Sequence, residues 1–162
     1  MIKQFCPQEF CLKCAGCCRF SQLNSQWSPG LLDEEIGILT KHLLPPALID
    51  SQRKIRLKPS AKGDYFICPL LNEEENKCRI YFSRPFECQL YPFLINRRQE
   101  KIYFSVDLNC AYAKENFNQQ SFKAYLAYLS SPLIAKACQE IIKNNPRLIQ
   151  SYPEVIDLAE IK

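Results

Sequence analysis

Cysteine is the residue that most constrains this chain, because five of its ten cysteines fall within the first 18 residues. Four of them form the run Cys11-Leu-Lys-Cys14-Ala-Gly-Cys17-Cys18. Cys-x-x-Cys spacing lets two thiolates converge on one ion, since the turn between them points both sulfurs to the same side. Three cysteines in Cys-x-x-Cys-x-x-Cys register can also enclose an iron–sulfur cube. The run therefore predicts a ligand-bearing loop that extends to Phe20.

Cys18 adds a constraint, because it directly follows Cys17. Neighbouring side chains diverge, so these two thiols cannot easily serve one ion equivalently. Either they bind two different ions, or one of them supports the ligands without binding. Gly16 is expected at a tight turn that needs a permissive backbone.

Cys68, Cys78 and Cys88 follow at even spacing, each at the edge of a predicted short element, and Cys110 closes a predicted strand. Eight thiols are enough for two four-coordinate sites. If all eight were thiolates, the net charge of +4 would become +4 − 8 = −4, and two divalent cations would restore it to 0. This neutrality favours a buried site with more than one metal ion, because unpaired buried thiolates are costly. The predicted ligands, which we expect to converge in space, are Cys11, Cys14, Cys17, Cys18, Cys68, Cys78, Cys88 and Cys110.

The alternative for these cysteines is a set of structural disulfides or isolated core thiols. The chain begins with a single basic residue ahead of Pro7, which is unlike a signal peptide, and no run approaches the roughly 18 apolar residues that span a bilayer. We therefore expect a cytoplasmic protein, in which thiols stay reduced. In that compartment a dense cysteine pattern favours metal binding over disulfides.

Composition excludes several other kinds of site. The four glycines lie too far apart for a phosphate- or dinucleotide-binding loop. A single histidine, His42, excludes sites that need two or three imidazoles. The net charge of +4 does not call for nucleic acid or an anionic membrane. Metal ions are the expected partners, with no membrane and no nucleic acid indicated, and the sequence names no protein partner.

The predicted fold class is α+β, in one small domain over residues 1–162, with 47% hydrophobic and 23% charged residues. Ser28-Pro29 predicts a helix start ahead of the apolar stripe Leu32, Ile36 and Leu39. Residues 53–57 and 65–67 are predicted to be short strands. These elements would surround the thiolate site within residues 10–110.

The later part of the chain is predicted to contain a hairpin followed by helices. Strict alternation over 102–108 indicates a half-buried strand, which would pair with 93–95 across a polar loop. Residues 119–145 are predicted to form two helices, the first with a possible Ser121 cap and the second beginning at Ser131-Pro132. The tail over 155–158 suits either a strand or a helix.

The motifs resemble those of the YkgJ-type cysteine cluster family, also written CxxCxxCC. The resemblance rests on four motifs in order over residues 10–110: Cys11-x-x-Cys14-x-x-Cys17-Cys18, Cys68-Pro-Leu-Leu, Cys78-Arg-Ile-Tyr81, and Arg84-Pro-Phe-Glu-Cys88-Gln-Leu-Tyr91-Pro92. It implies a zinc- or iron-chelating domain in a cytosolic setting. A related domain occurs within a flagellin lysine methylase, which implies iron–sulfur or methyl-transfer chemistry as an alternative.

Four residues have open or different roles. Cys138 lies on the apolar face of a predicted helix, where a free cysteine packs as a small hydrophobe, so we do not expect it to bind metal. Cys6 is either an extra ligand or a bystander. Arg84 would either donate hydrogen bonds to thiolate sulfurs or pair with a carboxylate while Tyr91 packs nearby.

Two functions are consistent with this sequence. The first is a metal-binding protein without evident catalytic residues, which holds zinc or iron through thiolates for folding, storage, delivery or contact with a partner. The second is an iron–sulfur redox protein or a cluster-dependent enzyme. Ligand type cannot separate zinc from iron, because thiolate suits both metals.

Overall fold

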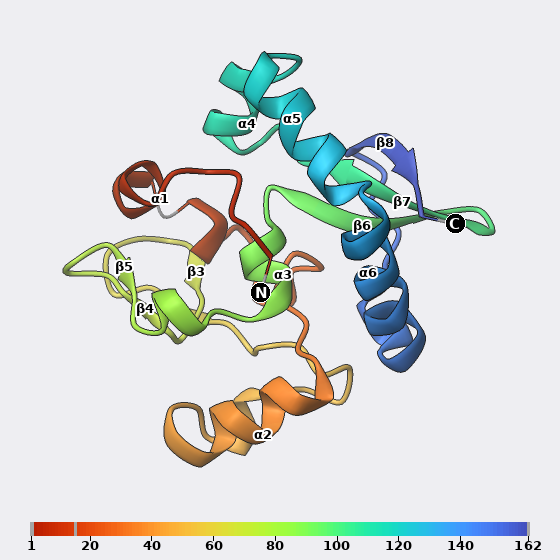
Figure 1. Cartoon of the computed structure of the whole chain (residues 1–162). Helices are drawn as coiled ribbons and strands as arrows, with labels where there is room; N and C mark the ends of the chain where they lie inside the picture. The colour runs from red at the N-terminus through yellow and green to blue at the C-terminus, as the bar shows by residue number, and fades with distance from the viewer. Residues whose placement is uncertain (1, 15, 162) are drawn as a thin grey trace. The chain divides into compact units, whose positions relative to one another are not determined.

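The computed structural model describes residues 2–14 and 16–161, except for the side chain of His42. The chain divides into two compact units: Pro7–Cys88, here called the cysteine unit, and Met1–Cys6 with Gln89–Lys162, here called the sheet unit. Helices and small antiparallel sheets are mixed along the chain (Figure 1), which confirms the predicted α+β class. The expectation that both units form one domain stays a prediction.

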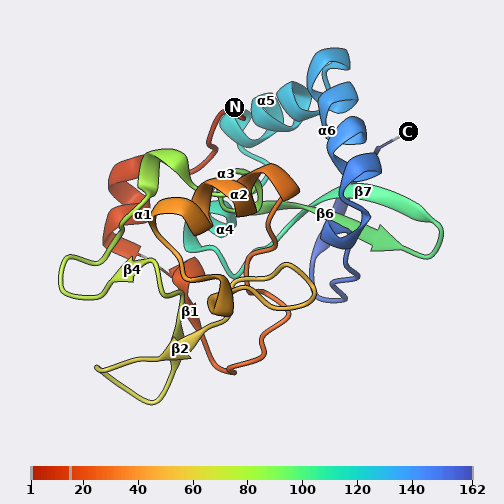
Figure 2. The ribbon, with the colours of Figure 1, turned by 90° about the horizontal axis from the view of Figure 1, so that it is seen from below.

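The cysteine unit consists of short elements. In chain order they are α1 (Gln8–Cys14), the 3-10 turn η1 (Gly16–Cys18), β1 (Arg19–Phe20), α2 (Asp33–His42), the 3-10 turn η2 (Pro46–Leu48), β2 (Lys58–Pro59), β3 (Phe66–Ile67), β4 (Leu71–Asn72), β5 (Lys77–Cys78) and the 3-10 turn η3 (Tyr81–Ser83). Helix α3 (Phe86–Leu90) carries the chain out of this unit. The strands form an antiparallel sheet of order β1-β3-β2, in which β3 lies between β1 and β2 (both labelled in Figure 2), and a separate β4-β5 hairpin.

The N-terminal run is helical, so the predicted loop is wrong for Cys11 and Cys14. The carbonyl of Pro7 accepts hydrogen bonds from the backbone N–H groups of Phe10 and Cys11 and so begins α1. Residues three apart lie on one face of a helix, which places Cys11 and Cys14 on the same side. The run lacks apolar periodicity because no residue of α1 is buried, and the sequence pattern therefore gave no sign of a helix.

Helix α2 begins at Asp33, four residues after the Pro29 start that the sequence predicts. Leu31 donates its N–H to the carbonyl of Arg53, and Pro29 accepts from Ile55, so this segment pairs as extended chain. The buried Ser28 hydroxyl donates to the Ile55 carbonyl instead of capping a helix. Residues 53–57, predicted as a strand, form only isolated bridges there.

The apolar stripe of α2 is nevertheless correct. Leu39 is buried in one core with Leu31, Ile55 and Leu70, and Ile36 packs against the same core. Cys68 belongs to this core, and Cys18 and Cys78 pack against it. The core of the cysteine unit therefore includes the thiols themselves.

The sheet unit contains longer elements. They are β6 (Phe93–Arg98), β7 (Lys101–Val106), α4 (Ala111–Asn116), α5 (Gln120–Leu129), α6 (Pro132–Asn144), the 3-10 turn η4 (Pro146–Leu148) and β8 (Ile156–Glu160). The predicted hairpin is confirmed as β6-β7, and β8 pairs antiparallel with β7. The two predicted C-terminal helices are α5 and α6, although α5 follows Gln119 rather than a Ser121 cap. The tail is a strand.

Aromatic rings fill the core of the sheet unit. Phe93 and Phe122 are fully buried with ring centroids 5.1 Å apart, and Tyr125 lies 4.9 Å from Phe93. Phe5 meets Phe93 edge-on at 5.4 Å, so the first residues of the chain are anchored in this unit. Such pairs add about 0.5–1.5 kcal/mol each beyond area burial. Cys138 is fully buried on α6, as the sequence predicts for a packing residue.

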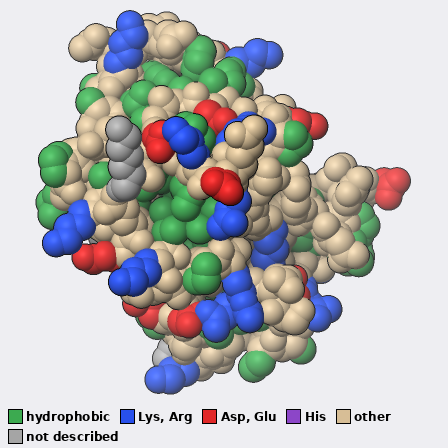
Figure 3. Space-filling view, turned by 90° about the vertical axis from the view of Figure 1, so that its right-hand side faces the viewer, with side chains coloured by type: hydrophobic (Ala, Val, Ile, Leu, Met, Phe, Trp, Pro, Cys, Tyr) green, Lys and Arg blue, Asp and Glu red, His purple; other side chains and the backbone are tan. Residues whose placement is uncertain are grey.

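The surface carries a mixture of side chains. On the face drawn in Figure 3, Lys and Arg are interspersed with Asp, Glu and hydrophobic residues. No helix in the described part of the chain is long and apolar enough to cross a bilayer.

A buried polar network ties the three strands of the sheet unit together. The side chain of Asn96 is fully buried, donates to Asp157 Oδ1 over 2.7 Å and accepts the N–H of Tyr152. Asp157 also accepts from Ser105 (2.6 Å) and from Arg98 (2.9 Å). Burial alone would raise the pKa of Asp157, but these hydrogen bonds outweigh it and lower the pKa.

The lowered pKa predicts an acid-sensitive contribution to stability. The unfolded chain binds a proton to Asp157 more tightly than the folded one, so the contribution is present above the unfolded pKa and is lost as pH falls through the folded pKa. We expect Asp157→Asn to lower the free energy of unfolding by about 1 kcal/mol at pH 7 and by clearly less at pH 3, measured by urea denaturation. Glu154→Gln, at an exposed site, serves as the control. Equal losses at both pH values for Asp157→Asn would contradict the assignment.

Candidate metal site

Cys17 stands at the centre of the candidate site. Its pKa is raised well above the usual value, first by a hydrogen bond with the thiol of Cys18, then by crowding protein atoms, and then by the charges of Cys18 and Cys11. Arg84 acts in the opposite direction and lowers it. The residue as a whole is exposed, although its thiol is crowded by protein atoms.

Cys68 and Cys78 meet Cys17 from two other motifs. Burial raises the pKa of Cys68 to about 12, and the charges of Cys78 and Cys17 add to this shift. Burial also raises the pKa of Cys78, with a further contribution from Cys17. In both residues a backbone N–H two positions later donates to the sulfur: Leu70 to Cys68 and Ile80 to Cys78. Such donors favour the thiolate, so each local turn is built for a charged sulfur.

Cys88 completes the group. Its pKa is raised well above the usual value, chiefly by burial and then by the charges of Cys68, Cys17, Glu87 and Cys78. Thiols from all four motifs within the cysteine unit are therefore close enough to oppose one another's ionisation.

Two half-buried carboxylates position the helix that carries Cys88. The N–H of Phe86 donates to Glu35 over 2.6 Å, and the N–H of Gly30 donates to Glu87 over 2.6 Å. Burial raises the pKa of both carboxyl groups. Neither Glu35 nor Glu87 is among the site residues that the sequence indicates, because these backbone partners lie more than 50 residues away.

The loop between α1 and β1 is held at both ends. Cys68 donates its N–H to the carbonyl of Cys18 over 3.1 Å, directly beside the pairing of Phe20 with Phe66. A Cβ at position 16 would lie 3.2 Å from Sγ of Cys14, so Gly16 leaves room for that sulfur. Cys14 itself is exposed.

Arg84 faces the thiols from η3. Its Nε donates to the carbonyl of Tyr81 over 2.9 Å, and its guanidinium lies 4.0 Å from the centroid of the Tyr81 ring. From this position its charge lowers the pKa of both Cys17 and Cys78. This agrees with the interpretation of Arg84 as a residue that tunes the sulfurs.

Cys110 belongs to the sheet unit, where it begins α4. The turn before it is held by Asp107, whose carboxylate accepts from the Tyr91 hydroxyl (2.9 Å) and from the N–H of Asn109 (2.8 Å). Tyr91 therefore binds the segment that leads to Cys110. The ligand role of Cys110 stays a prediction. Cys6 is buried in the same unit.

The thiols fit a metal ion because of their chemistry, although they are not already arranged as a coordination shell. None of the ten cysteines, all of which lie in the described part of the chain, forms a disulfide. Within residues 2–14 and 16–161, no three His, Cys, Asp or Glu side chains are already arranged to hold an ion. However, the crowded thiols keep their protons because burial disfavours their thiolates and neighbouring thiolates repel one another, and a cation among them would offset both effects. The donor set therefore fits zinc or iron.

The fold and the thiol cluster define a small α+β protein in which cysteines from separate motifs gather within one compact unit. The chain belongs to the CxxCxxCC family, described as a "putative zinc- or iron-chelating domain", whose family model matches residues 10–123. This match confirms the resemblance found in the sequence and extends it past Cys110 into α5. It supports metal chelation in general. No curated protein and no solved structure gives a significant match to the chain.

The burial of the thiols predicts their order of reaction with an alkylating reagent. Only the thiolate reacts, and a pKa of about 12 leaves roughly one Cys68 in 10,000 ionised at pH 8. We expect exposed Cys14 to be modified at least about tenfold faster than Cys68 in reduced, metal-free, folded protein, measured by peptide mass spectrometry. In denaturant the two rates should become similar. Equal rates in the folded protein would contradict the burial of Cys68.

Proposed function

We propose that the chain binds zinc or iron through the thiolates of the cysteine unit. The observation that carries the proposal is that Cys17, Cys68, Cys78 and Cys88, which come from four separate motifs, lie close enough for their charges to add to the pKa rises that burial and hydrogen bonding cause. The match to a family described as zinc- or iron-chelating supports the same function. The proposed ligands are Cys11, Cys14, Cys17, Cys18, Cys68, Cys78 and Cys88, with Cys110 as a predicted eighth.

The residues around these thiols have distinct roles in this proposal. Leu70 and Ile80 offer backbone N–H groups to sulfur, and Arg84 supplies positive charge beside Cys17 and Cys78. These groups stabilise thiolates while protons leave. When bound, the metal supplies the positive charge that lets several thiolates coexist. We assign no catalytic residue, and the alternative remains an iron–sulfur protein with redox or catalytic activity.

Ligand variants test the proposal. We expect Cys17→Ala and Cys78→Ala each to reduce the metal bound per chain, because each removes a thiolate from the crowded group. Cys138→Ala is the control: it deletes a fully buried thiol on α6, outside the cysteine unit, and should leave metal content unchanged while lowering stability modestly. Metal content is measured by elemental analysis of the purified proteins.

A loss of metal in Cys138→Ala equal to that in Cys17→Ala would show that the effect is not specific to the cysteine unit. Unchanged metal in both Cys17→Ala and Cys78→Ala would contradict the proposal. Cys110→Ala, measured in the same series, tests the predicted eighth ligand.

Anaerobic purification separates the two metals. We expect either a colourless protein with stoichiometric zinc, or a brown protein whose visible absorption is lost on reduction or exposure to air. The preparation must be anaerobic, because zinc can replace a labile cluster in air. If the purified protein contains neither metal and takes up neither on reconstitution, the proposed function is contradicted.

A further inference from the structure

Asn76 occupies the turn that joins β4 and β5, two residues before Cys78. Its φ is +53°, a left-handed conformation that asparagine tolerates better than most residues. Asn76 was not among the site residues that the sequence indicates, because it carries no metal-binding group and belongs to none of the matched motifs.

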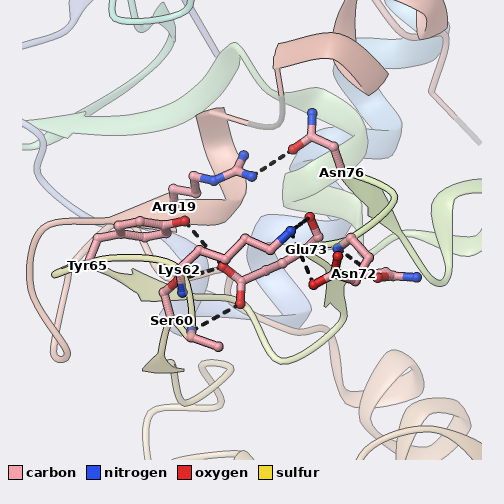
Figure 4. A network of polar contacts seen from close by, with 9 residues as sticks. Arg19, Ser60, Lys62, Tyr65, Asn72, Glu73 and Asn76 are labelled. Atoms are coloured by element: carbon pink, nitrogen blue, oxygen red, sulfur yellow. Dashed lines mark hydrogen bonds and ion pairs between the residues drawn. The ribbon is translucent and has the colours of Figure 1, made fainter.

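The side chain of Asn76 links two distant segments. Its Nδ2 donates to the carbonyls of Leu12 (2.8 Å) and Lys13 (3.1 Å), which end α1 and have no acceptor role within the helix. Its Oδ1 accepts from Arg19 over 2.7 Å, as Figure 4 shows. Lys13 directly precedes Cys14, and Arg19 directly follows Cys18. The side-chain amide of Asn76 therefore binds the cysteine run at two points, just before Cys14 and just after Cys18.

The turn that presents Asn76 is itself fixed. The Glu73 carboxylate accepts hydrogen bonds from the Ser60 hydroxyl (2.6 Å) and the Tyr65 hydroxyl (3.2 Å). Lys62 donates to the Glu73 carbonyl over 3.0 Å (Figure 4). These hydrogen bonds attach the β4-β5 hairpin to the β2-β3 connection, so the turn that carries Asn76 is held in place.

We propose that Asn76 is a positioning residue that sets the CxxCxxCC run beside Cys78 and Cys68 before metal binds. This inference rests on the proposed metal-binding function. Because no residue of α1 is buried, polar contacts matter for the order of the run, and the three hydrogen bonds that Asn76 makes add to the backbone hydrogen bond between Cys68 and Cys18 in fixing it. Pre-ordering the ligands reduces the conformational entropy lost on binding.

Three variants of the full chain separate the parts of this proposal. Asn76→Gly keeps the backbone conformation and deletes the side chain. Asn76→Asp keeps the acceptor for Arg19 but replaces the donor to Leu12 and Lys13 with a carboxylate. Gln99→Gly is the matched control, because Gln99 also has a positive φ (56°) in a hairpin turn, between β6 and β7.

We expect Asn76→Gly to weaken zinc binding by about 10-fold and Asn76→Asp by more, as supporting residues of metal sites commonly do. Gln99→Gly should bind like the wild type. Affinity is measured by competition with a chromophoric chelator, and cobalt substitution reports ligand geometry through its visible spectrum. Hydrogen exchange of residues 8–14 in the metal-free protein should be faster in both Asn76 variants and unchanged in the control.

The outcomes distinguish the two proposals. Wild-type zinc affinity and an unaltered cobalt spectrum in both Asn76 variants would overturn the positioning role while leaving metal binding intact. Equal weakening in Gln99→Gly would also overturn it, because the loss would then follow from general destabilisation. If no variant nor the wild type binds zinc, cobalt or iron, the metal function fails. Faster exchange in α1 of the Asn76 variants would still show that Asn76 orders the run.

Discussion

Several thiols lie in one crowded cluster, and the cost of ionising them there is the constraint on which the cysteine unit depends. Burial is the largest cause that raises the pKa of Cys68, Cys78 and Cys88, and repulsion by a thiolate at Cys17 adds to it in each. The unit therefore folds with neutral sulfurs that pack as apolar groups, with Cys68 inside its core. The same arrangement places several sulfurs that can become negatively charged close together. In the proposed function, protons and a metal ion compete for these sulfurs, so the same thiols contribute to both folding and metal affinity.

The unit balances this repulsion with neutral dipoles more than with opposite charge. Backbone N–H groups of Leu70 and Ile80 reach two sulfurs, and Arg84 is the cation whose charge acts on both Cys17 and Cys78. Arg84 is held in place by the carbonyl and ring of Tyr81. If every thiolate had a cationic side chain beside it, the thiolates would be stable without metal and would gain less from binding one. With few cationic side chains nearby, a bound metal would be the main source of positive charge.

The sequence identified the ligand candidates and the fold class because both depend on local spacing. Strict alternation located the β6-β7 hairpin, and helical spacing located Cys138 on a packed face. The sequence did not locate Asn76, Glu35 or Glu87, whose partners are backbone groups 51 to 64 residues away. Nearly every residue has a backbone carbonyl and a backbone N–H, so residue type does not reveal which of these groups will be a partner. Ser28-Pro29 failed as a helix start for the same reason, since extended pairing with residues 53–55 competes successfully for that backbone.

The division of the chain has a consequence for biosynthesis. The cysteine unit is one uninterrupted segment, whereas the sheet unit combines Met1–Cys6 with Gln89–Lys162. On a ribosome, all of the cysteine unit is available once Cys88 has emerged. Phe5, however, has no Phe93 or Phe122 to pack against until the second half of the chain is made. The proposed cysteine ligands can therefore bind metal before Phe5 has packed against its partners, and β8 joins the sheet of the other unit later still.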